Sequence, residues 1–153
     1  MPICVNRYGD VLEDFFEISE EEAVQEKWFP ITHALVVAKN RDGYLFMFNR
    51  WKNHWEVAGG MLEEGESLRQ CALRELLEET NQIPSRMWFR GLMKFHLRNG
   101  KTEYGGVFCA YIDETRPFQS NEEAGEIVFW DGKEEIGYVD EIDRTLIRYY
   151  LEE

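Results

Sequence analysis

The pattern of hydrophobic and polar positions predicts a chain rich in β-structure. Short runs of β-branched and aromatic residues indicate strands at 31–39, 44–50, 92–98, 103–113 and 127–130. Asn40-Arg41-Asp42-Gly43 joins the first two runs, and its Asp-Gly pair suits the positive φ angles of a tight turn. Asn99-Gly100 joins the next two and is the pair that type I′ turns favour. The chain is therefore predicted to form two β-hairpins and one further strand.

A helix is predicted between the two hairpins, from Glu66 to Asn81. This segment contains no Gly or Pro and is rich in Leu, Glu, Arg and Gln, which are good helix formers. Ser67 followed by Gln70 forms a capping box at its start. At its end, Asn81 suits a left-handed conformation, and Pro84 prevents continuation.

A helical wheel divides this helix into an apolar side and an acidic side. The apolar side, which we expect to face the core, carries Leu73, Leu76, Leu77 and Thr80. The opposite side carries Glu75, Glu78 and Glu79. Like charges at these spacings repel each other by about a few tenths of a kcal/mol per pair. The cluster indicates either a solvated surface or a site where something compensates the charge.

Two more helical segments are predicted near the ends of the chain. Residues 141–151 carry an apolar stripe of Ile142, Leu146, Ile147 and Tyr150, and residues 20–28 have a helix-like pattern. Strands that pair mainly with their neighbours in sequence, together with a few helices, predict an α+β fold with a sheet packed by helices.

Composition narrows the classes of ligand. The chain has 153 residues, with 17 Lys and Arg against 30 Asp and Glu, for a net charge of −13. The length predicts one domain over residues 1–153, because a chain of this size can bury a sufficient core. The negative charge argues against binding long nucleic acids or anionic membranes. A small phosphate ester remains possible, because carboxylates can hold divalent cations that reverse the local charge.

The cysteine and histidine patterns give no sign of a zinc site. Cys4, Cys71 and Cys109 lie far apart and outside metal-binding spacings, so we expect reduced thiols and a cytoplasmic protein. His33, His54 and His96 also lack a mutual metal spacing. The start of the chain lacks an export signal, and no run of eighteen apolar residues predicts a membrane span.

A glycine-rich loop precedes the acidic helix. It reads Gly59-Gly60-Met61-Leu62-Glu63-Glu64-Gly65-Glu66 and brings bare backbone groups and a further carboxylate toward the helix N-terminus. Converging oxygen ligands are how proteins hold Mg²⁺ or Mn²⁺.

From Gly60 to Gln82 the sequence resembles the Nudix box of the Nudix hydrolases, G-x5-E-x7-R-E-U-x-E-E-x-G-U, where U is bulky and aliphatic. The matching residues are Gly60, Glu66, Arg74, Glu75, Leu76, Glu78 and Glu79. Asn81 replaces the final Gly, and Gln82 replaces the final aliphatic residue. Ala58 stands where the family has a Pro before the glycine pair. The departures remove none of the expected ligands.

The resemblance implies a fold and an activity. The fold would be the Nudix α/β/α sandwich, with a mixed central sheet flanked by helices. The activity would be that of a MutT-like nucleotide pyrophosphohydrolase, with Mg²⁺ or Mn²⁺ as cofactor. Signatures of the NADH, ADP-ribose and dinucleoside-polyphosphate subclasses are absent. This absence favours a nucleoside triphosphate, including oxidised or otherwise nonstandard ones, cleaved to monophosphate and pyrophosphate.

The resemblance also implies roles for individual residues. The metal ligands would be the Gly59 carbonyl, Glu75, Glu78 and Glu79. Arg74 would orient a neighbouring glutamate, and Gly60 and Glu66 would brace the loop. The general base would be a box glutamate, Glu75 or Glu79, or an acid late in the chain: Glu122, Glu123 or Glu126. Candidates for substrate contacts are Arg50, Trp51 and Trp55, through phosphate binding and base stacking.

Other interpretations stay open from the sequence. One is a catalytically inactive Nudix-like domain that binds a nucleotide in a regulatory role. Another is an acidic cation-binding protein without nucleotide chemistry. Residues 1–28 either cap the sheet or pair across a homodimer, an arrangement common among Nudix proteins.

Overall fold

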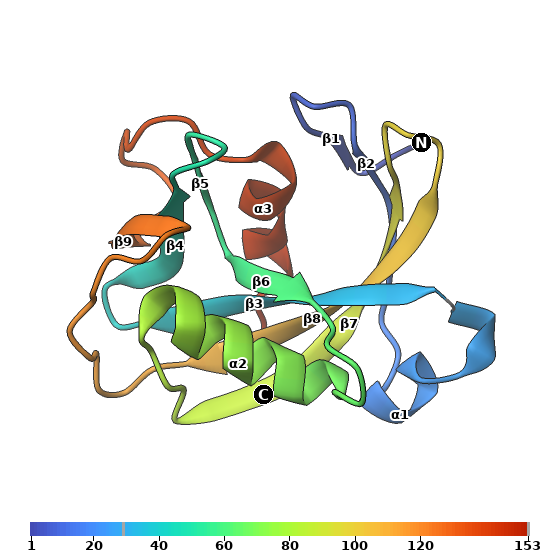
Figure 1. The fold of residues 1–153 in the computed structure, drawn as a ribbon, viewed down its shortest axis with the longest axis horizontal. Coiled ribbons are helices and arrows are strands. Elements are labelled where there is room, and N and C mark those ends of the chain that lie inside the picture. The colour runs from blue at the N-terminus through green and yellow to red at the C-terminus, as the bar shows by residue number, and fades with distance from the viewer. Residues whose placement is uncertain (29, 153) are drawn as a thin grey trace.

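The computed structural model describes residues 1–28 and 30–152. Strands from these residues form a mixed sheet (Figure 1). Its strands are β1 (Cys4–Val5), β2 (Val11–Phe16), β3 (Ile31–Asn40), β4 (Gly43–Asn49), β5 (His54–Glu56), β6 (Ala58–Met61), β7 (Arg86–His96), β8 (Thr102–Tyr111) and β9 (Ala124–Trp130). The main strand order is β1-β2-β7-β8-β3-β4-β5, with β6 paired to β3 and β9 to β4. β3 and β8 run parallel, and the other pairs are antiparallel.

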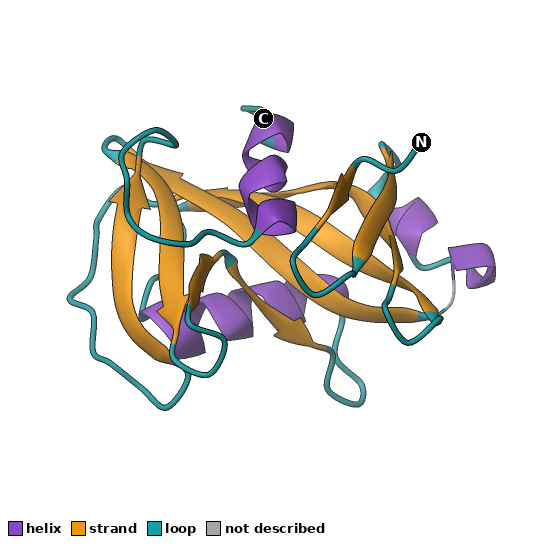
Figure 2. Ribbon diagram, turned by 90° about the horizontal axis from the view of Figure 1, so that it is seen from above, coloured by secondary structure: helices purple, strands orange, loops and turns teal. Residues whose placement is uncertain are grey.

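Helices lie on both sides of this sheet. They are α1 (Glu20–Ala23), α2 (Leu68–Thr80) and α3 (Glu141–Leu146), with 3₁₀ turns at Glu26–Trp28 and Ile147–Tyr149. Figure 2 shows α2 and α3 on opposite sides of the strands, so the predicted α/β/α sandwich with a mixed central sheet is confirmed. None of the helices in the described part of the chain is both long and apolar enough to span a membrane.

The side chains of β3 alternate between the two faces of the sheet and pack into a hydrophobic cluster on each side. Ala34, Val36 and Ala38 belong to the cluster that includes Leu76 of α2. Val37 belongs to the second cluster, with Ile142 and Leu146 of α3. Because successive side chains of a strand point to opposite faces, one strand anchors both helices.

The first predicted hairpin exists, but its strands separate almost at once. β3 and β4 pair only at Lys39↔Tyr44 and Asn40↔Gly43. Beyond this point β3 pairs with β6 and β8, whereas β4 pairs with β5 and β9. Asp42 does not adopt the expected positive φ. The Asn40 side chain holds the turn instead, since its Oδ1 accepts hydrogen bonds from the amides of Asp42 and Gly43 at 2.8 and 3.1 Å.

The second hairpin, β7–β8, is confirmed, and the predicted type I′ turn is wrong. A type I′ turn needs positive φ at both central residues. Here Gly100 has φ 88°, but Asn99 does not have a positive φ. The Gly100 amide donates to the Leu97 carbonyl, and the Lys101 amide donates to Asn99 Oδ1. β7 also begins at Arg86, six residues before the predicted Leu92, with an irregularity between Phe89 and Gly91.

Helix α2 has the predicted ends but not the predicted buried face. The Ser67–Gln70 capping box is present, and Asn81 is left-handed with φ 59°. Leu76 and Thr80 are buried as expected, whereas Leu73 and Leu77 are 40% and 42% exposed. The small residues Cys71 and Ala72 are fully buried instead. Small side chains let the helix lie close to β6, which shifts the buried stripe toward the glycine-rich loop.

The two ends of the chain differ from expectation in detail. The N-terminal segment adds strands rather than capping the sheet, because β2 pairs with β7 from Val11↔His96 to Phe16↔Leu92. The helix expected over 20–28 is divided into α1 and a 3₁₀ turn. At the C-terminus, α3 ends at Leu146 and a 3₁₀ turn follows, so Leu151 lies outside the predicted helix.

Candidate functional site

The buried carboxylate of Glu79 is the centre of the site. Glu79 lies near the end of α2 and is 4% exposed, which excludes the solvated-surface alternative for this residue. Its Oε1 accepts a hydrogen bond of 2.9 Å from the Gly59 amide. Its Oε2 is buried and has no hydrogen-bond partner among the described residues. An unpaired buried carboxylate oxygen is costly, so the site requires a proton or a cation.

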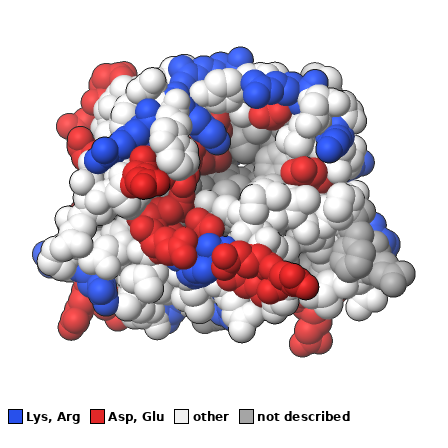
Figure 3. Space-filling model, in the orientation of Figure 1, with Lys and Arg blue, Asp and Glu red and all other residues white. Residues whose placement is uncertain are grey.

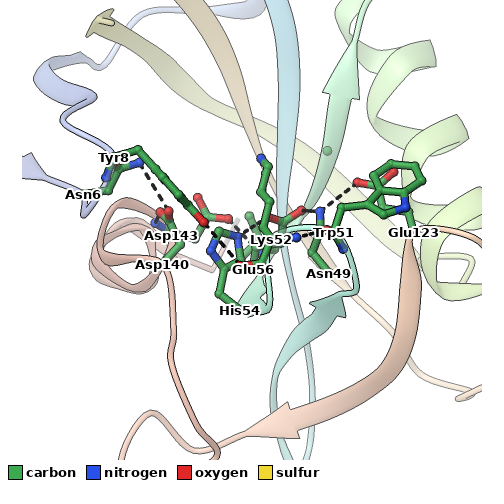
Figure 4. A network of polar contacts seen from close by, with 12 residues as sticks. Asn6, Tyr8, Asn49, Trp51, Lys52, His54, Glu56, Glu123, Asp140 and Asp143 are labelled. Atoms are coloured by element: carbon green, nitrogen blue, oxygen red, sulfur yellow. Dashed lines mark hydrogen bonds and ion pairs between the residues drawn. The ribbon is translucent and has the colours of Figure 1, made fainter. Parts of the chain in front are cut away.

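Two further glutamates converge on Glu79. Glu56 ends β5, and Glu123 immediately precedes β9. One carboxylate oxygen from each of Glu56, Glu79 and Glu123 lies within 4.8 Å of the others. Asn49 Nδ2 donates to Glu56 Oε2 at 3.1 Å and to Glu123 Oε2 at 3.2 Å (Figure 4). His54 Nε2 lies 2.6 Å from Glu56 Oε1. The strands therefore fix both carboxylates beside the helix.

The donor set fits a divalent cation. Burial raises the pKa of the Glu79 carboxyl well above its ordinary range, and the nearby charges of Glu123, Glu75 and Glu56 add to the effect. A hard cation binds carboxylate oxygens and would compensate these charges. Glu56, Glu79 and Glu123 are the residues placed to hold it.

Arg74 compensates the remaining box glutamates. Its guanidinium binds Glu66 through two hydrogen bonds of 2.6 and 2.9 Å, and binds Glu75 at 2.7 Å and Glu78 at 3.2 Å. A further ion pair joins Arg74 Nε to Glu63 at 3.0 Å. The Arg74 hydrogen bond lowers the pKa of Glu66 to about 2, with help from the Glu63 amide. Much of the repulsion predicted on this helix is thus relieved by one cation of the chain itself.

Gly60 makes room for Glu75. A Cβ atom at position 60 would lie 2.5 Å from Cδ and 2.6 Å from Oε1 of Glu75. Any larger residue would displace this carboxylate. Burial raises the Glu75 pKa, while Arg74 lowers it. The glycine-rich loop therefore packs directly against the acidic face of the helix.

Some of the other predicted site residues reach the carboxylate cluster and some do not. Of the three late acids, Glu123 reaches the cluster, whereas Glu122 and Glu126 are exposed. Glu78 has a side chain that is 59% exposed. The Gly59 amide contacts Glu79, and its carbonyl, the group expected to bind metal, lies on β6 where the strand pairs with β3.

The three residues expected to contact substrate differ in exposure. Trp55 is only 6% exposed, and its indole donates to the Ile136 carbonyl at 2.7 Å. It packs against Phe48 in the core, which corrects the expectation that it stacks on substrate. Trp51 is 68% exposed, and Arg50 is exposed beside it.

Sequence reasoning missed Glu56 and Asn49. Glu56 interrupts the mainly apolar run from Trp55 to Gly60, and an acid within such a run is a usable signal. Asn49 is 1% exposed, and its Oδ1 accepts the amides of Trp51 and Lys52. The sequence around Asn49 contains no comparable signal of this role.

A cavity of about 350 Å³ opens beside the carboxylates. Its lining includes Glu56, Gly59, Gly60 and Glu123 on one side, and His33, Leu35 and Phe95 from the sheet. Figure 3 shows a hollow on this face, with acidic side chains gathered next to it and Lys and Arg along the upper rim. The site thus has room for a small ligand next to a place for a cation.

Comparisons with known proteins identify a matching family and similar structures. The profile of the family described as NUDIX domain matches residues 28–150. Over 48 residues the chain is 44% identical to the RNA pyrophosphohydrolase of Wolbachia pipientis wMel, a match that covers 29% of this chain and 30% of that protein. The chain therefore matches less than a third of the length of this curated relative.

Solved structures share the fold. The Bacillus subtilis pyrophosphohydrolase BsRppH aligns with a TM-score of 0.67 at 19% identity, over 83% of this chain and 75% of that one. A MutT Nudix hydrolase from Burkholderia pseudomallei aligns with a TM-score of 0.66 at 13% identity, over 78% of this chain and 96% of that one. At these identities the likeness establishes a common architecture.

Proposed function

Because this chain belongs to the Nudix family, whose profile covers residues 28–150, we propose that it is a divalent-cation-dependent hydrolase of pyrophosphate bonds in nucleotides. The observation that carries the proposal is the buried Glu79 carboxylate, whose Oε2 has no hydrogen-bond partner among the described residues and which offers an oxygen within 4.8 Å of oxygens of Glu56 and Glu123.

Of the three converging acids, Glu56 and Glu79 would hold Mg²⁺ or Mn²⁺, which leaves Glu123 for proton transfer. Glu75 lies close enough to influence the Glu79 carboxyl electrostatically. A bound ion neutralises phosphate charge and stabilises the charge that develops on the leaving oxygen. We assign Arg74 the role of keeping Glu75 in place, through their 2.7 Å hydrogen bond. Glu78 is mostly exposed and contributes to the local negative charge.

Glu123 is the proposed general base. Because Asn49 Nδ2 donates a hydrogen bond to Glu123 Oε2, we assign proton transfer to the other oxygen, Oε1. In the reaction, water forms a bond to phosphorus, the bridging P–O bond breaks, and Glu123 takes the proton of the water. When water attacks the α-phosphorus of a nucleoside triphosphate, pyrophosphate is the leaving group and departs with the bond electrons.

The proposed substrate is a nucleoside triphosphate, including oxidised or otherwise nonstandard ones, with monophosphate and pyrophosphate as products. Trp51 and Arg50 stand at the exposed loop after β4, where an indole can stack on a base and a guanidinium can bind phosphate. Reduced Cys4, Cys71 and Cys109 suit a cytoplasmic protein.

A second candidate substrate is the 5′-triphosphate end of RNA, because the Wolbachia relative is an RNA pyrophosphohydrolase. The net charge of −13 opposes contact with a long RNA chain, so we favour the mononucleotide.

The test is a panel of nucleoside triphosphates and a short 5′-triphosphorylated RNA, with pyrophosphate and phosphate release measured in Mg²⁺, in Mn²⁺ and with chelator. We expect metal-dependent pyrophosphate release, fastest with a mononucleotide. Faster turnover of the RNA than of any mononucleotide would make the RNA end the preferred substrate. Nucleotide-dependent thermal stabilisation without turnover would favour the inactive regulatory domain, and metal binding without any nucleotide effect would favour a cation-binding protein.

A further inference from the structure

The turn between β1 and β2 contributes to the cavity from outside the region that matches the family. Asn6 and Asp10 line the cavity, although the family profile begins only at residue 28. Asp140 and Asp143, from the start of α3, line it next to this turn. Figure 4 shows Asn6 and Tyr8 reaching from the N-terminal segment toward these two acids.

Several contacts hold this turn in place. The Arg7 guanidinium donates to the Lys52 carbonyl at 2.8 Å and lies 4.0 Å from the centre of the Tyr138 ring. The Arg7 amide donates to Glu141 Oε1 at 3.2 Å. Tyr8 also donates its hydroxyl to the Lys52 carbonyl, at 3.3 Å. The turn is therefore fixed to both the loop after β4 and the start of α3.

Hydrogen bonds fix the polar groups that face the cavity. Asn6 Oδ1 accepts the amides of Tyr8 and Asp10, and its Nδ2 donates to Asp140 Oδ2 at 3.4 Å. Asp10 Oδ1 accepts the Arg98 amide at 2.9 Å. Asp143 Oδ2 accepts the Val57 amide at 3.0 Å. Each aspartate uses backbone groups for orientation, so the wall is preorganised before a ligand enters.

The charge of the wall limits what can bind there. Four acids line this part of the cavity, namely Asp10, Glu103, Asp140 and Asp143. His33 lies beside Glu103, and burial lowers its pKa to about 4, so it adds no positive charge at neutral pH. Among the described lining residues Lys52 is the one Lys or Arg, and it lies 3.9 Å from Glu56. Burial and the nearby Asp140 and Glu56 raise the pKa of Asp143 well above its ordinary range. Such a wall suits neutral hydrogen-bonding groups and repels phosphate.

We propose that the Asn6–Asp10 turn, with Asp140 and Asp143, is a specificity element that binds the hydrogen-bond donors of the nucleobase of a mononucleotide. This proposal rests on the proposed function for the identity of the substrate. Guanine presents two adjacent donors, its N1–H and its amino group, whereas uracil presents a single ring N–H. Leu35, Phe95 and Leu97 supply apolar surface in the same cavity for the flat base. The wall therefore selects guanine over uracil and disfavours a second phosphorylated group.

The test measures binding apart from hydrolysis. Calorimetry with GMP and with UMP, in chelator, compares the wild type with Asp10→Asn and Asp140→Asn; Asn keeps the hydrogen-bond acceptor and remains a good N-cap at position 140. The matched control is Asp14→Asn, an exposed position of β2 on the same hairpin and outside the cavity. We expect the wild type and the control to prefer GMP. Each wall variant should lose about 10-fold of its GMP affinity and change little toward UMP.

Arg7→Ala tests the positioning of the turn, since Arg7 anchors it without lining the cavity. We expect a weaker preference for GMP, with a melting temperature within a few degrees of the wild type. Equal GMP affinity in the wild type and both wall variants would overturn the proposal, even if pyrophosphate release is found. A GMP preference that depends on Asp10 in a protein that releases no pyrophosphate would support the wall and contradict the proposed function instead.

Discussion

The amide of Gly59 donates a hydrogen bond of 2.9 Å to Oε1 of Glu79, which fixes the glycine-rich loop to helix α2. The bond also fixes Oε2 of the same carboxylate in a buried position without a partner among the described residues. A Cβ atom at position 59 would lie 2.6 Å from the Ala34 carbonyl, so glycine permits this close approach. The loop and the helix thus hold this carboxylate in place for the proposed cation.

Glu56→Gln is expected to weaken cation binding, because Glu56 supplies one of the converging oxygens. The expected loss of Mg²⁺ affinity is at least about 10-fold, measured by calorimetry without nucleotide. Glu126→Gln is the matched control, as Glu126 is an exposed acid on β9. If both variants bind Mg²⁺ as well as the wild type, Glu56 is not a ligand.

Arg74→Lys is expected to reduce both the melting temperature and the turnover number. Lysine cannot reproduce the two parallel hydrogen bonds to Glu66 while also binding Glu75. Arg69→Lys is the control on the same helix, because Arg69 binds Glu20 through two hydrogen bonds away from the site. We expect Arg69→Lys to lower only the melting temperature. Equal turnover in Arg74→Lys and the wild type would show that Arg74 has a purely structural role.

The variants Trp51→Ala and Trp55→Ala are expected to differ in stability, because Trp51 lies on the surface and Trp55 in the core. Trp55 is 6% exposed, so its truncation should cost about 3–5 kcal/mol of unfolding free energy in urea denaturation. Trp51 is 68% exposed, so its truncation should change stability by less than about 0.5 kcal/mol. If Trp51 stacks on the base, KM should rise with little change in kcat. An unchanged KM would assign Trp51 to the surface alone.

His33 is expected to make the protein sensitive to mild acid. Burial lowers its pKa from 6.5 to about 4, although Glu103 opposes the shift. The unfolded chain therefore takes up a proton at a higher pH than the folded protein does. The stability contributed by neutral His33 is complete above pH 6.5 and is lost as the pH falls through 4, by about 3 kcal/mol in total.

Urea denaturation between pH 7 and pH 4 measures this effect, with His33→Gln as the comparison. The variant should lose less stability across this range than the wild type. Parallel curves for the two proteins would contradict a role for His33, and His96→Gln serves as a control because His96 is exposed.

The sequence predicts those features that depend on neighbouring residues. The capping box at Ser67 and the left-handed Asn81 follow from local hydrogen bonding and backbone sterics, and both are present. Arg74, which was expected to orient a neighbouring glutamate, binds Glu75 at 2.7 Å.

Features that depend on distant residues escape this reasoning. The parallel pairing of β3 with β8 joins Ile31 to Tyr104 and could not be read from local pattern. The pairing of β4 with β9 also joins distant residues and, together with the pairing of β4 with β5, brings Glu56 and Glu123 together and creates the site. The buried face of α2 was similarly misjudged, because contact with β6 rather than hydrophobicity decides that Cys71 is buried and Leu73 is exposed.

The buried Glu79 carboxylate is the group that we propose supports cation-dependent catalysis. The most direct measurement is Mg²⁺-dependent pyrophosphate release by the wild type, by Glu79→Gln and by Glu122→Gln, whose position is exposed and outside the cluster. Glutamine can keep the bond from Gly59 but loses the charge, so Glu79→Gln should fold and lose activity by at least about 100-fold. Glu122→Gln should match the wild type. Equal rates in Glu79→Gln and the wild type would contradict the account.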